Sequence, residues 1–329
     1  MNCKRIGVTT TVPVEIIYAA GHIPVDLNNI FITSPRRDEA VTAAELAGFP
    51  RTVCGWIKGI YGIATASPPP VDMIIAVTEG DCSQTHALME TLEYQGFSVI
   101  PFSFPFNHER ESLRRQMEFL ADALGTSIAA AKEQKQRLDE VRSLVWEIDR
   151  LTWQEAKVSG FENHYWQVSC SDFEGNPEAF GKRAKEFIRE ANERPGRGPC
   201  LKMGLIGVPP IIDDIYSYLE EREAGIIFNE VQRQFSMPEA IELDLIDQYL
   251  IYTYPYHVRY RVADIAAEIK RRNLNGIIHY TQSFCFRQIE DLLFRRFLEP
   301  HILSIEGDQP GLLDARTKMR IDTFLAMLR

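Results

Sequence analysis

Three cysteines far apart in the chain share one context, in which an apolar stretch gives way to an amphipathic helix pattern. They are Cys54, Cys82 and Cys285, in the segments RTVCGWIKGIYG, IIAVTEGDCSQTHALMETL and GIIHYTQSFCFRQIEDLLFRR. A helix N-terminus carries unpaired N–H groups and a partial positive charge, so it favours a thiolate over a thiol. Three thiolates meeting at one point would make a metal site. Three buried thiols in strand-to-helix turns are the alternative that this pattern leaves open.

The residues just before these cysteines fit helix starts. Thr52, Asp81 and Ser283 are of types favoured at N-caps. The chain has no CxxC pair and no cysteine–histidine cluster at zinc-finger spacing. Any metal site must therefore be assembled by the fold from distant segments.

Apolar strand patterns alternate with helix patterns at both ends of the chain. Strands such as VDMIIAV and GIIHY are each followed by an amphipathic helix, an order typical of a parallel sheet covered on both faces. We predict an α/β protein with two open parallel-sheet domains of the Rossmann or flavodoxin-like kind. The expected parts are an N-terminal α/β domain over 1–106, a helical linking region over 107–196 and a C-terminal α/β domain over 197–329.

This architecture brings the cysteines together. Ligands of open parallel sheets bind beyond the carboxyl ends of the strands. Cys82 follows VDMIIAV and Cys285 follows NGIIHY, so both are expected at the functional edges of their sheets, and Cys54 heads a helix of the first half. If the two domains face each other, the three thiols converge in the cleft between them. Three thiolates suit a [4Fe–4S] cluster with one open iron better than structural zinc, which takes four ligands.

Other polar residues are expected near the same cleft. As catalytic candidates we name His86, one turn into the Cys82 helix, and the strand-end carboxylates Glu79 and Glu306. A helix-surface position is the simpler interpretation of His86.

Four further residues are candidates for binding substrate. They are Asn28 and Asn29 in VDLNNIF, Trp56 beside Cys54, and Arg287 beside Cys285, which could meet a phosphate or carboxylate.

Bulk composition narrows the class of protein. The 329 residues are 45% hydrophobic and 25% charged, which is ordinary for a soluble globular protein. A net charge of −10 argues against a general nucleic-acid binder. We see no secretory signal and no membrane span, and expect a cytoplasmic protein. GLIGVPP lacks both GxGxxG and a Walker lysine, so no nucleotide site is expected.

The cysteine segments, together with LSIEGDQPGLLDARTKMRIDTFLAML, resemble the iron–sulfur subunits of the 2-hydroxyacyl-CoA dehydratase/benzoyl-CoA reductase family. The resemblance runs through both α/β halves and is weak in the helical middle. It implies that Cys54, Cys82 and Cys285 bind one [4Fe–4S] cluster between two domains. It also implies an anaerobic enzyme, a lyase or an oxidoreductase, to which an ATP-hydrolysing iron–sulfur activator delivers a low-potential electron. The electron passes to a thioester carbonyl, giving a ketyl radical that expels the hydroxyl group or is reduced further.

The chain departs from the family pattern in two respects. It is shorter than typical members, so loops that would hold coenzyme A are open to doubt. It also lacks the three additional cysteines of the double-cubane relatives, since the matching stretches read IIFNEVQRQF and LIYTYPYHVRYR. Cys3, Cys170 and Cys200 fall outside the matching contexts. We therefore expect a single cluster per chain.

Three hypotheses about function follow. The first is a radical dehydratase or reductase acting on a small molecule, with a CoA thioester as the expected substrate. The second is a non-catalytic electron-transfer or cluster-carrying subunit, or a reductase of a different small molecule. The third is a metal-free binding protein that keeps the fold. The resemblance implies a dimer, either of identical chains or with a related subunit.

Overall fold

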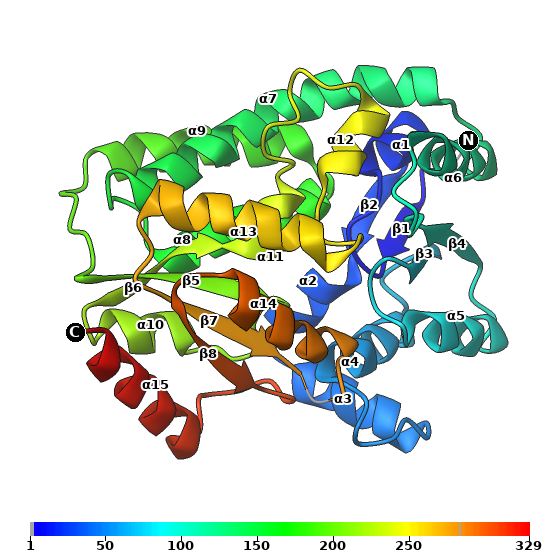
Figure 1. The fold of residues 1–329 in the computed structure, drawn as a ribbon. Coiled ribbons are helices and arrows are strands. Elements are labelled where there is room, and N and C mark those ends of the chain that lie inside the picture. Colours follow the sequence, from blue (N-terminus) through cyan, green and yellow to red (C-terminus); the bar gives the residue numbers. More distant parts are fainter. Residues whose placement is uncertain (1–2, 283) are drawn as a thin grey trace.

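Two four-stranded parallel sheets, one from each half of the chain, form the framework of the protein (Figure 1). The structure is a computed structural model and describes residues 3–282 and 284–329. The expectation for Ser283 lies outside these residues. The first sheet has the order β2-β1-β3-β4 and the second β6-β5-β7-β8. The strands are β1 (Arg5–Val8), β2 (Ile23–Asp26), β3 (Met73–Glu79), β4 (Val99–Ser103), β5 (Leu201–Gly207), β6 (Ala224–Asn229), β7 (Gly276–Thr281) and β8 (His301–Glu306).

The two sheets repeat one topology, with the first strand of each half paired to the second on one side and to the third on the other. This confirms the predicted class, an α/β protein built on two parallel sheets. In such a sheet the chain changes direction between the first and third strands, and the crevice there is where ligands bind. The sheets therefore define two crevices, at the carboxyl ends of β1 and β3 and of β5 and β7.

Helices cover both sheets. Those that follow strands in the first half are α1 (Val14–Ala19), α2 (Leu27–Thr33), α3 (Arg37–Leu46), α4 (Gly55–Ala64) and α5 (Thr85–Tyr94). The corresponding elements of the second half are α10 (Ile215–Glu220), α11 (Glu230–Phe235), α12 (Leu245–Ile251), α13 (Val258–Arg272), η3 (Phe286–Glu290), α14 (Asp291–Phe297) and α15 (Ala315–Leu328).

The middle of the chain is helical, as its 3.6-residue periodicity predicts. It comprises α6 (Arg110–Ala123), α7 (Ile128–Trp153), α8 (Gly160–Val168), η1 (Ser169–Ser171), η2 (Phe173–Gly175) and α9 (Pro177–Asn192). The long helices α7 and α9 run side by side along one side of the molecule (Figure 1). The three domain ranges given above stay a prediction.

A shared apolar core joins the two halves. Ile57 and Ile60 of α4 belong to the same buried cluster as Ile211 and Tyr280 of the second half. A second cluster packs the first sheet against α6 and α7 and also takes in residues 231–256 of the second half. Because apolar burial stabilises in proportion to the area removed from water, these two clusters hold the sheets in a fixed relation.

Direct contacts reinforce this junction. Arg37 pairs with Asp213 through a 2.7 Å hydrogen bond from Nη1 to Oδ1. At Gly55, the first residue of α4, an added Cβ would lie 2.6 Å from the carbonyl oxygen of Asp308. A glycine at this point is what allows the start of α4 to approach the loop that follows β8.

Candidate functional site

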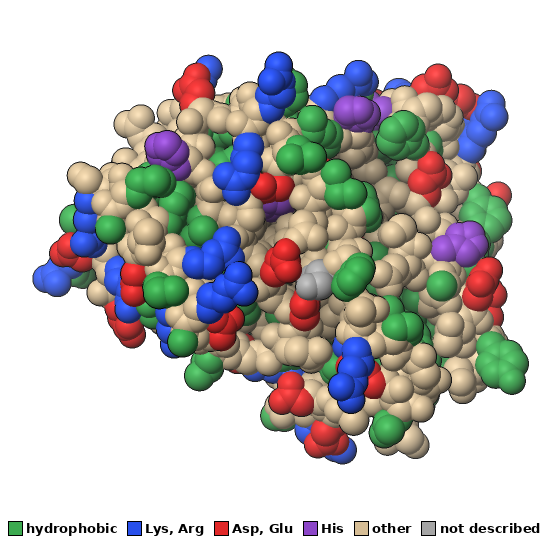
Figure 2. Space-filling view, turned by 60° about the horizontal axis from the view of Figure 1, so that its bottom comes forward, with side chains coloured by type: hydrophobic (Ala, Val, Ile, Leu, Met, Phe, Trp, Pro, Cys, Tyr) green, Lys and Arg blue, Asp and Glu red, His purple; other side chains and the backbone are tan. Residues whose placement is uncertain are grey.

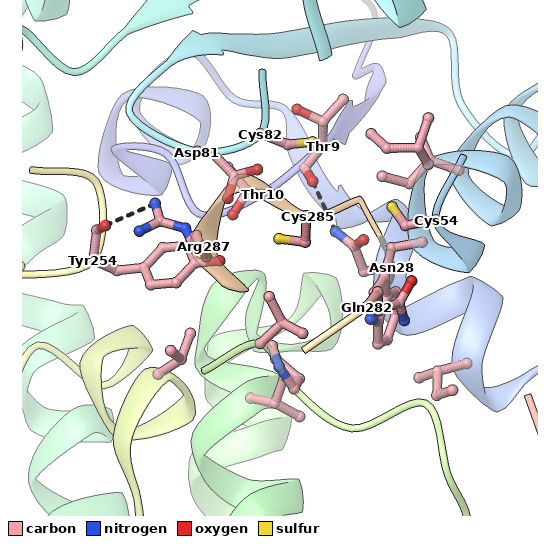
Figure 3. A pocket seen from close by; sticks show the side chains of 18 of the residues that line it. Thr9, Thr10, Asn28, Cys54, Asp81, Cys82, Tyr254, Gln282, Cys285 and Arg287 are labelled. Carbon is pink, nitrogen blue, oxygen red and sulfur yellow. Dashed lines mark hydrogen bonds between the residues drawn. The ribbon is translucent and has the colours of Figure 1, made fainter. Parts of the chain in front are cut away.

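A cavity lies between the two sheets, at the crevices that their topology defines (Figure 3). Its empty volume is about 1000 Å³, part of which is open to solvent. Part of the wall is formed by residues just beyond the carboxyl ends of strands: Thr9 and Thr10 after β1, Asp81 and Cys82 after β3, Val208 to Pro210 after β5, and Gln282 and Cys285 after β7. Both halves of the chain therefore build one site.

Cys54 lines this cavity as the N-cap residue of α4, with extended backbone angles of φ −61° and ψ 152°. Its position at a helix start is as predicted, although Cys54 itself, not Thr52, is the cap. Its sulfur accepts hydrogen bonds from the backbone N–H groups of Ile57 and Trp56. Burial raises the pKa of the thiol to about 11, with the nearby Cys285 adding to the rise. The backbone N–H groups at the start of α4 thus lower the pKa of the Cys54 thiol, but by less than burial raises it.

Cys82 lines the cavity from a turn, not from a helix N-terminus. The helix α5 begins only at Thr85 and has Gln84 as its N-cap, so the expected helix from residue 82, capped by Asp81, was wrong. The reason lies in the preceding turn, where Gly80 has a φ of +96° and packs tightly against Pro255 and Phe104. The sulfur still accepts a backbone N–H, from Gln84, and burial raises the pKa of the thiol to about 12.

Cys285 is the N-cap residue of η3, a 3₁₀-helix that leads into α14. Its sulfur accepts the backbone N–H of Arg287, and burial raises the pKa of this thiol as well. Cys285 raises the pKa of both Cys54 and Cys82, and Cys54 raises the pKa of Cys82, which means that the sulfurs lie within electrostatic reach of one another. In Figure 3 the three cysteines come from three different elements and surround the same space.

The spacing of the three thiols distinguishes a site for a single metal ion from a site for a cluster. Among residues 3–282 and 284–329, no group of three His, Cys, Asp or Glu side chains is close enough to hold a single metal ion. A cubane differs from a single ion because its three thiolates bind three different irons and stand apart around the cluster. Three thiols spread around one cavity, each receiving backbone N–H groups, fit that arrangement. Metal binding would have to displace the thiol protons, which burial otherwise retains.

Arg287 lines the cavity and clamps its two sides together. The guanidinium donates to the carbonyl oxygens of Gly80, at 3.1 Å, and Tyr254, at 3.0 Å, and it stacks on the Tyr254 ring at 4.0 Å (Figure 3). An ion pair with Glu290 at 3.4 Å completes its contacts. Gly80 belongs to the first half of the chain and Arg287 to the second, so this side chain fixes one half against the other beside Cys82 and Cys285.

The other three expected substrate-binding residues also line the cavity. Asn28 donates from Nδ2 to the carbonyl oxygen of Thr9 at 2.8 Å (Figure 3). Asn29 donates to the hydroxyl of Ser171 at 3.1 Å. Trp56 packs edge-on against Phe31, and its buried Nε1 has no hydrogen-bond partner. The structure brings these residues to the cavity that the three thiols line.

The three expected catalytic residues do not line the cavity. His86 and Glu90 are on the exposed face of α5, whose opposite face buries Leu88 and Leu92. Glu79 is turned toward the β4 side, where it accepts the backbone N–H of Phe106 at 3.3 Å.

Glu306 ends the edge strand β8, away from the crevice, and accepts a hydrogen bond from Gln288. The sequence located these carboxylates at strand ends but did not reveal which way they face.

The remaining cysteines lie elsewhere. Cys3 and Cys200 are exposed, and Cys170 is 1% exposed within the helical core, where its sulfur donates to the carbonyl oxygen of Trp166 at 3.5 Å. Their separation from the trio agrees with the expectation that they lie outside the cysteine contexts.

Sequence reasoning missed several polar residues of the cavity, among them Gln282 and His164. Gln282, 1% exposed, follows β7 directly, and its Oε1 has no hydrogen-bond partner among the described residues. Its place in HYTQSFC, between a strand end and a cysteine, was a usable signal. His164 comes from α8 in the helical middle, and burial lowers its pKa to about 4. It is therefore neutral near pH 7, with Nδ1 bonded to Gln232 at 3.0 Å. No local pattern connects α8 with a cavity at the sheet edges.

A comparison with known families shows to which family the chain belongs. The family model for 2-hydroxyglutaryl-CoA dehydratase, D-component, matches residues 9–328. The chain belongs to this family. The D-component match spans both sheets, the helical middle and all three cavity cysteines, so it covers the whole site. It identifies the protein as a component of a 2-hydroxyacyl-CoA dehydratase-type enzyme. No curated protein matches the chain.

One further property concerns the long helices of this D-component protein. Within the described part of the chain, no helix combines the length and the apolar character needed to span a membrane. Even α7, with 26 residues, carries many charged side chains.

Proposed function

We propose that this D-component protein binds one [4Fe–4S] cluster through Cys54, Cys82 and Cys285 and uses it for radical dehydration or reduction of a 2-hydroxyacyl thioester. The observation that carries the proposal is the convergence of three thiols, from three distant segments, on one cavity at the crevices of both sheets. When bound, such a cluster supplies single electrons at low potential and leaves one iron open to a ligand. Membership in the family supports the same assignment.

The chain's own residues would prepare the cavity for that group. The backbone N–H groups that already point at the three sulfurs would stabilise them as thiolates and offset the negative charge of a cluster. Arg287 contributes a positive charge that lowers the pKa of Cys285, and because its hydrogen bonds hold Gly80 and Tyr254, we assign it a positioning role. Apolar residues such as Ile57, Ile60 and Val231 exclude water from the same wall.

We propose that the substrate contacts the polar side chains beside Cys54, namely Asn28, Asn29, Trp56 and Gln282. Trp56 and Gln282 have buried polar atoms without partners, and such atoms are costly unless a ligand satisfies them. His164, neutral and half-buried, would donate or accept a hydrogen bond without adding charge to the cavity.

The electron is proposed to come from an ATP-hydrolysing activator that docks on the surface next to Cys285. An apolar face on η3 and α14 adjoins this cysteine, with Phe286, Ile289, Leu292 and Phe297 from 42% to 70% exposed. Figure 2 shows that hydrophobic side chains on the visible face are interspersed with acidic and basic ones, as on interfaces with a mixed rim. An activator seated here would be separated from the cavity only by η3.

Activator-driven turnover tests the proposal. Anaerobically reconstituted protein would be mixed with a family activator, ATP and a 2-hydroxyacyl-CoA, and reduction and reoxidation of the cluster followed by its visible and paramagnetic spectra. We expect ATP-dependent reduction, and reoxidation that requires the thioester. Reduction without any substrate-dependent reoxidation would favour an electron-transfer subunit instead. Absence of ATP-dependent reduction, with cluster present, would contradict the proposed activator.

The docking face has its own control. Leu292→Glu adds a charge to the face on α14, whereas Met319→Glu adds the same charge to α15, where Met319 is 64% exposed. The first variant should slow electron transfer from the activator without changing iron content, and the second should leave both unchanged. Equal rates of electron transfer in the two variants would contradict docking of the activator on this face.

A further inference from the structure

Two buried carboxyl groups lie between the cavity and a second hollow on the surface. Asp26, at the end of β2, lines the cavity, and Asp172, between η1 and η2, lines a hollow of about 1270 Å³ that is partly open to solvent. Their exposed fractions are 4% and 6%. The backbone N–H of Asp26 donates to Oδ2 of Asp172 at 2.8 Å, so the two residues are in direct contact. Nothing in the proposed function so far uses either carboxyl group.

In the described part of the chain, neither carboxyl group of this pair forms an ion pair, so the charge on the pair has no counter-ion there. Asp26 accepts hydrogen bonds from the N–H and the Nδ2 of Asn28, both at 2.9 Å, and from the side chain of Ser171. Asp172 accepts only backbone N–H groups, from Asp26 and from Glu174, at 2.8 Å each. Two adjacent buried carboxylates without a cation are unfavourable, so one of them is expected to retain its proton.

The groups around the pair indicate which of the two carboxyl groups retains its proton. The titratable groups facing Asp172 include Asp26, Glu174, the buried thiol of Cys170, and Tyr18, whose hydroxyl donates to the Asp172 carbonyl oxygen at 2.6 Å. Asp26 in turn faces the carboxyl group of Asp81 across the cavity wall. The nearby cations are committed elsewhere, Arg183 to Glu174 and Arg142 to Glu15 and Asp139. Burial and, secondly, the charge of Asp26 raise the pKa of Asp172 to about 7, against the lowering effect of its two backbone hydrogen bonds. Burial also raises the pKa of Asp26, but its hydrogen bonds oppose that rise.

We propose that Asp172 and Asp26 supply a proton to the cavity when negative charge arrives there. Asp172 takes a proton from water in the outer hollow and passes it to Asp26. The O–H bond of Asp172 breaks as one forms on Asp26, water reprotonates Asp172, and no electrons move within the pair. The role rests on the proposed function, which brings an electron and a substrate oxygen into the cavity and so creates the demand for a proton.

A structural role must be separated from this one, because both aspartates also act as caps. Asp26 caps α2 and Asp172 accepts the N–H of Glu174 at the start of η2. Asparagine caps helices about as well as aspartate but cannot exchange a proton. Asp172→Asn and Asp26→Asn therefore keep the caps and remove the titrating groups. Asp314→Asn is the matched control, because Asp314 is an exposed cap that accepts the N–H of Thr317 at 2.8 Å.

The first test needs no cluster. Infrared spectroscopy of the metal-free protein would follow the C=O band of a protonated carboxylic acid as the pH is raised. We expect the wild-type protein to lose such a band with a midpoint near 7, the value expected for Asp172. Asp172→Asn should lose the component of the band that titrates with this midpoint, although a component from Asp81, whose pKa burial raises to about 6, remains. Asp26→Asn should lower the midpoint of the Asp172 component, and Asp314→Asn should match wild type. A band that persists unchanged in Asp172→Asn would overturn the proposal.

The second test measures proton uptake by the reconstituted protein during reduction of its cluster, with a pH indicator, one pH unit above the infrared midpoint. We expect wild type and Asp314→Asn to take up protons with the electron, and uptake to fall at least about twofold in Asp172→Asn and in Asp26→Asn. Equal uptake in all four proteins would refute proton supply by this pair. If no cluster forms in wild type, the proposed function fails, while the infrared titration still decides whether Asp172 stores a proton.

Discussion

Replacing Gly55 by alanine probes the contact that sets the start of α4 against the second half of the chain. The added Cβ would lie 2.6 Å from the carbonyl oxygen of Asp308 and 2.9 Å from Cδ1 of Ile211. Moving the carbonyl contact from 2.6 to 3.4 Å, the lower limit of ordinary van der Waals contact, requires a shift of about 0.8 Å. Overpacking of this kind costs about 1–3 kcal/mol, and the gain in helix propensity offsets at most about 1 kcal/mol. We expect a net loss of about 1–2 kcal/mol.

Gly181→Ala is the matched control, because its added Cβ in α9 would meet Val141 at 3.4 Å, an ordinary contact. That variant should gain about 0.5–1 kcal/mol from helix propensity. Urea unfolding measures both variants. In addition, Gly55→Ala should lose reconstituted iron to a chelator faster than Gly181→Ala, because the shift displaces Cys54. A Gly55→Ala protein that is as stable as Gly181→Ala, and that retains iron as long, would refute the close contact between the halves.

Two further predictions concern buried charge. Arg272→Met should lower the free energy of unfolding by about 3–5 kcal/mol, because it leaves Asp149 buried without its ion-pair partner and leaves Glu268 with Arg271 alone. Arg36→Met, which removes an exposed pair with Glu39, should leave the free energy of unfolding unchanged in the same urea titration. His164→Asn should reduce the loss of stability on acidification. The folded pKa of about 4 lies below the ordinary 6.5, so the unfolded chain binds the extra proton and stability falls as the pH drops from 6.5 toward 4. If wild type and variant lose stability in parallel between these pH values, His164 is not a buried neutral group.

The sequence was sufficient to predict the framework of the site. Apolar runs such as VDMIIAV and GIIHY are long enough to be buried strands, and the helix patterns after them imply parallel pairing. Parallel strands align their carboxyl ends, so the segments containing Cys82 and Cys285 had to reach functional edges of the sheets. The common cavity then followed from one assumption, that the two halves face each other.

What the sequence did not reveal depends on tertiary contacts. Glu79 and Glu306 occur at strand ends as expected, but a strand end does not specify which side of the sheet a side chain faces, and β8 is an edge strand. Cys82 was expected to start a helix, yet the turn at Gly80, pressed against Pro255 from the other half, delays the helix to Thr85. Contacts between residues far apart in sequence leave no local pattern.

Asp172 and His164 were missed for the same reason. Both come from the helical middle, where the periodicity describes only the face that packs on α7 or α9. Their positions depend on how α8 and η1 pack against α11 and on how η2 packs against β2. These are contacts between segments far apart in the sequence. Local sequence reasoning can predict the amphipathic face of such a helix, but not which elements from distant parts of the sequence pack against its other faces.

The most direct test of the central claim is iron content across single cysteine variants. Wild-type protein and six Cys→Ser variants would be reconstituted anaerobically, and iron and acid-labile sulfide measured together with the paramagnetic spectrum of the reduced state. Cys54→Ser, Cys82→Ser and Cys285→Ser should each lose most of the about four irons expected per chain, while the Cys3, Cys170 and Cys200 variants retain them. Full iron content in any one of the first three, or loss in all six, would contradict a single cluster held by these three thiols.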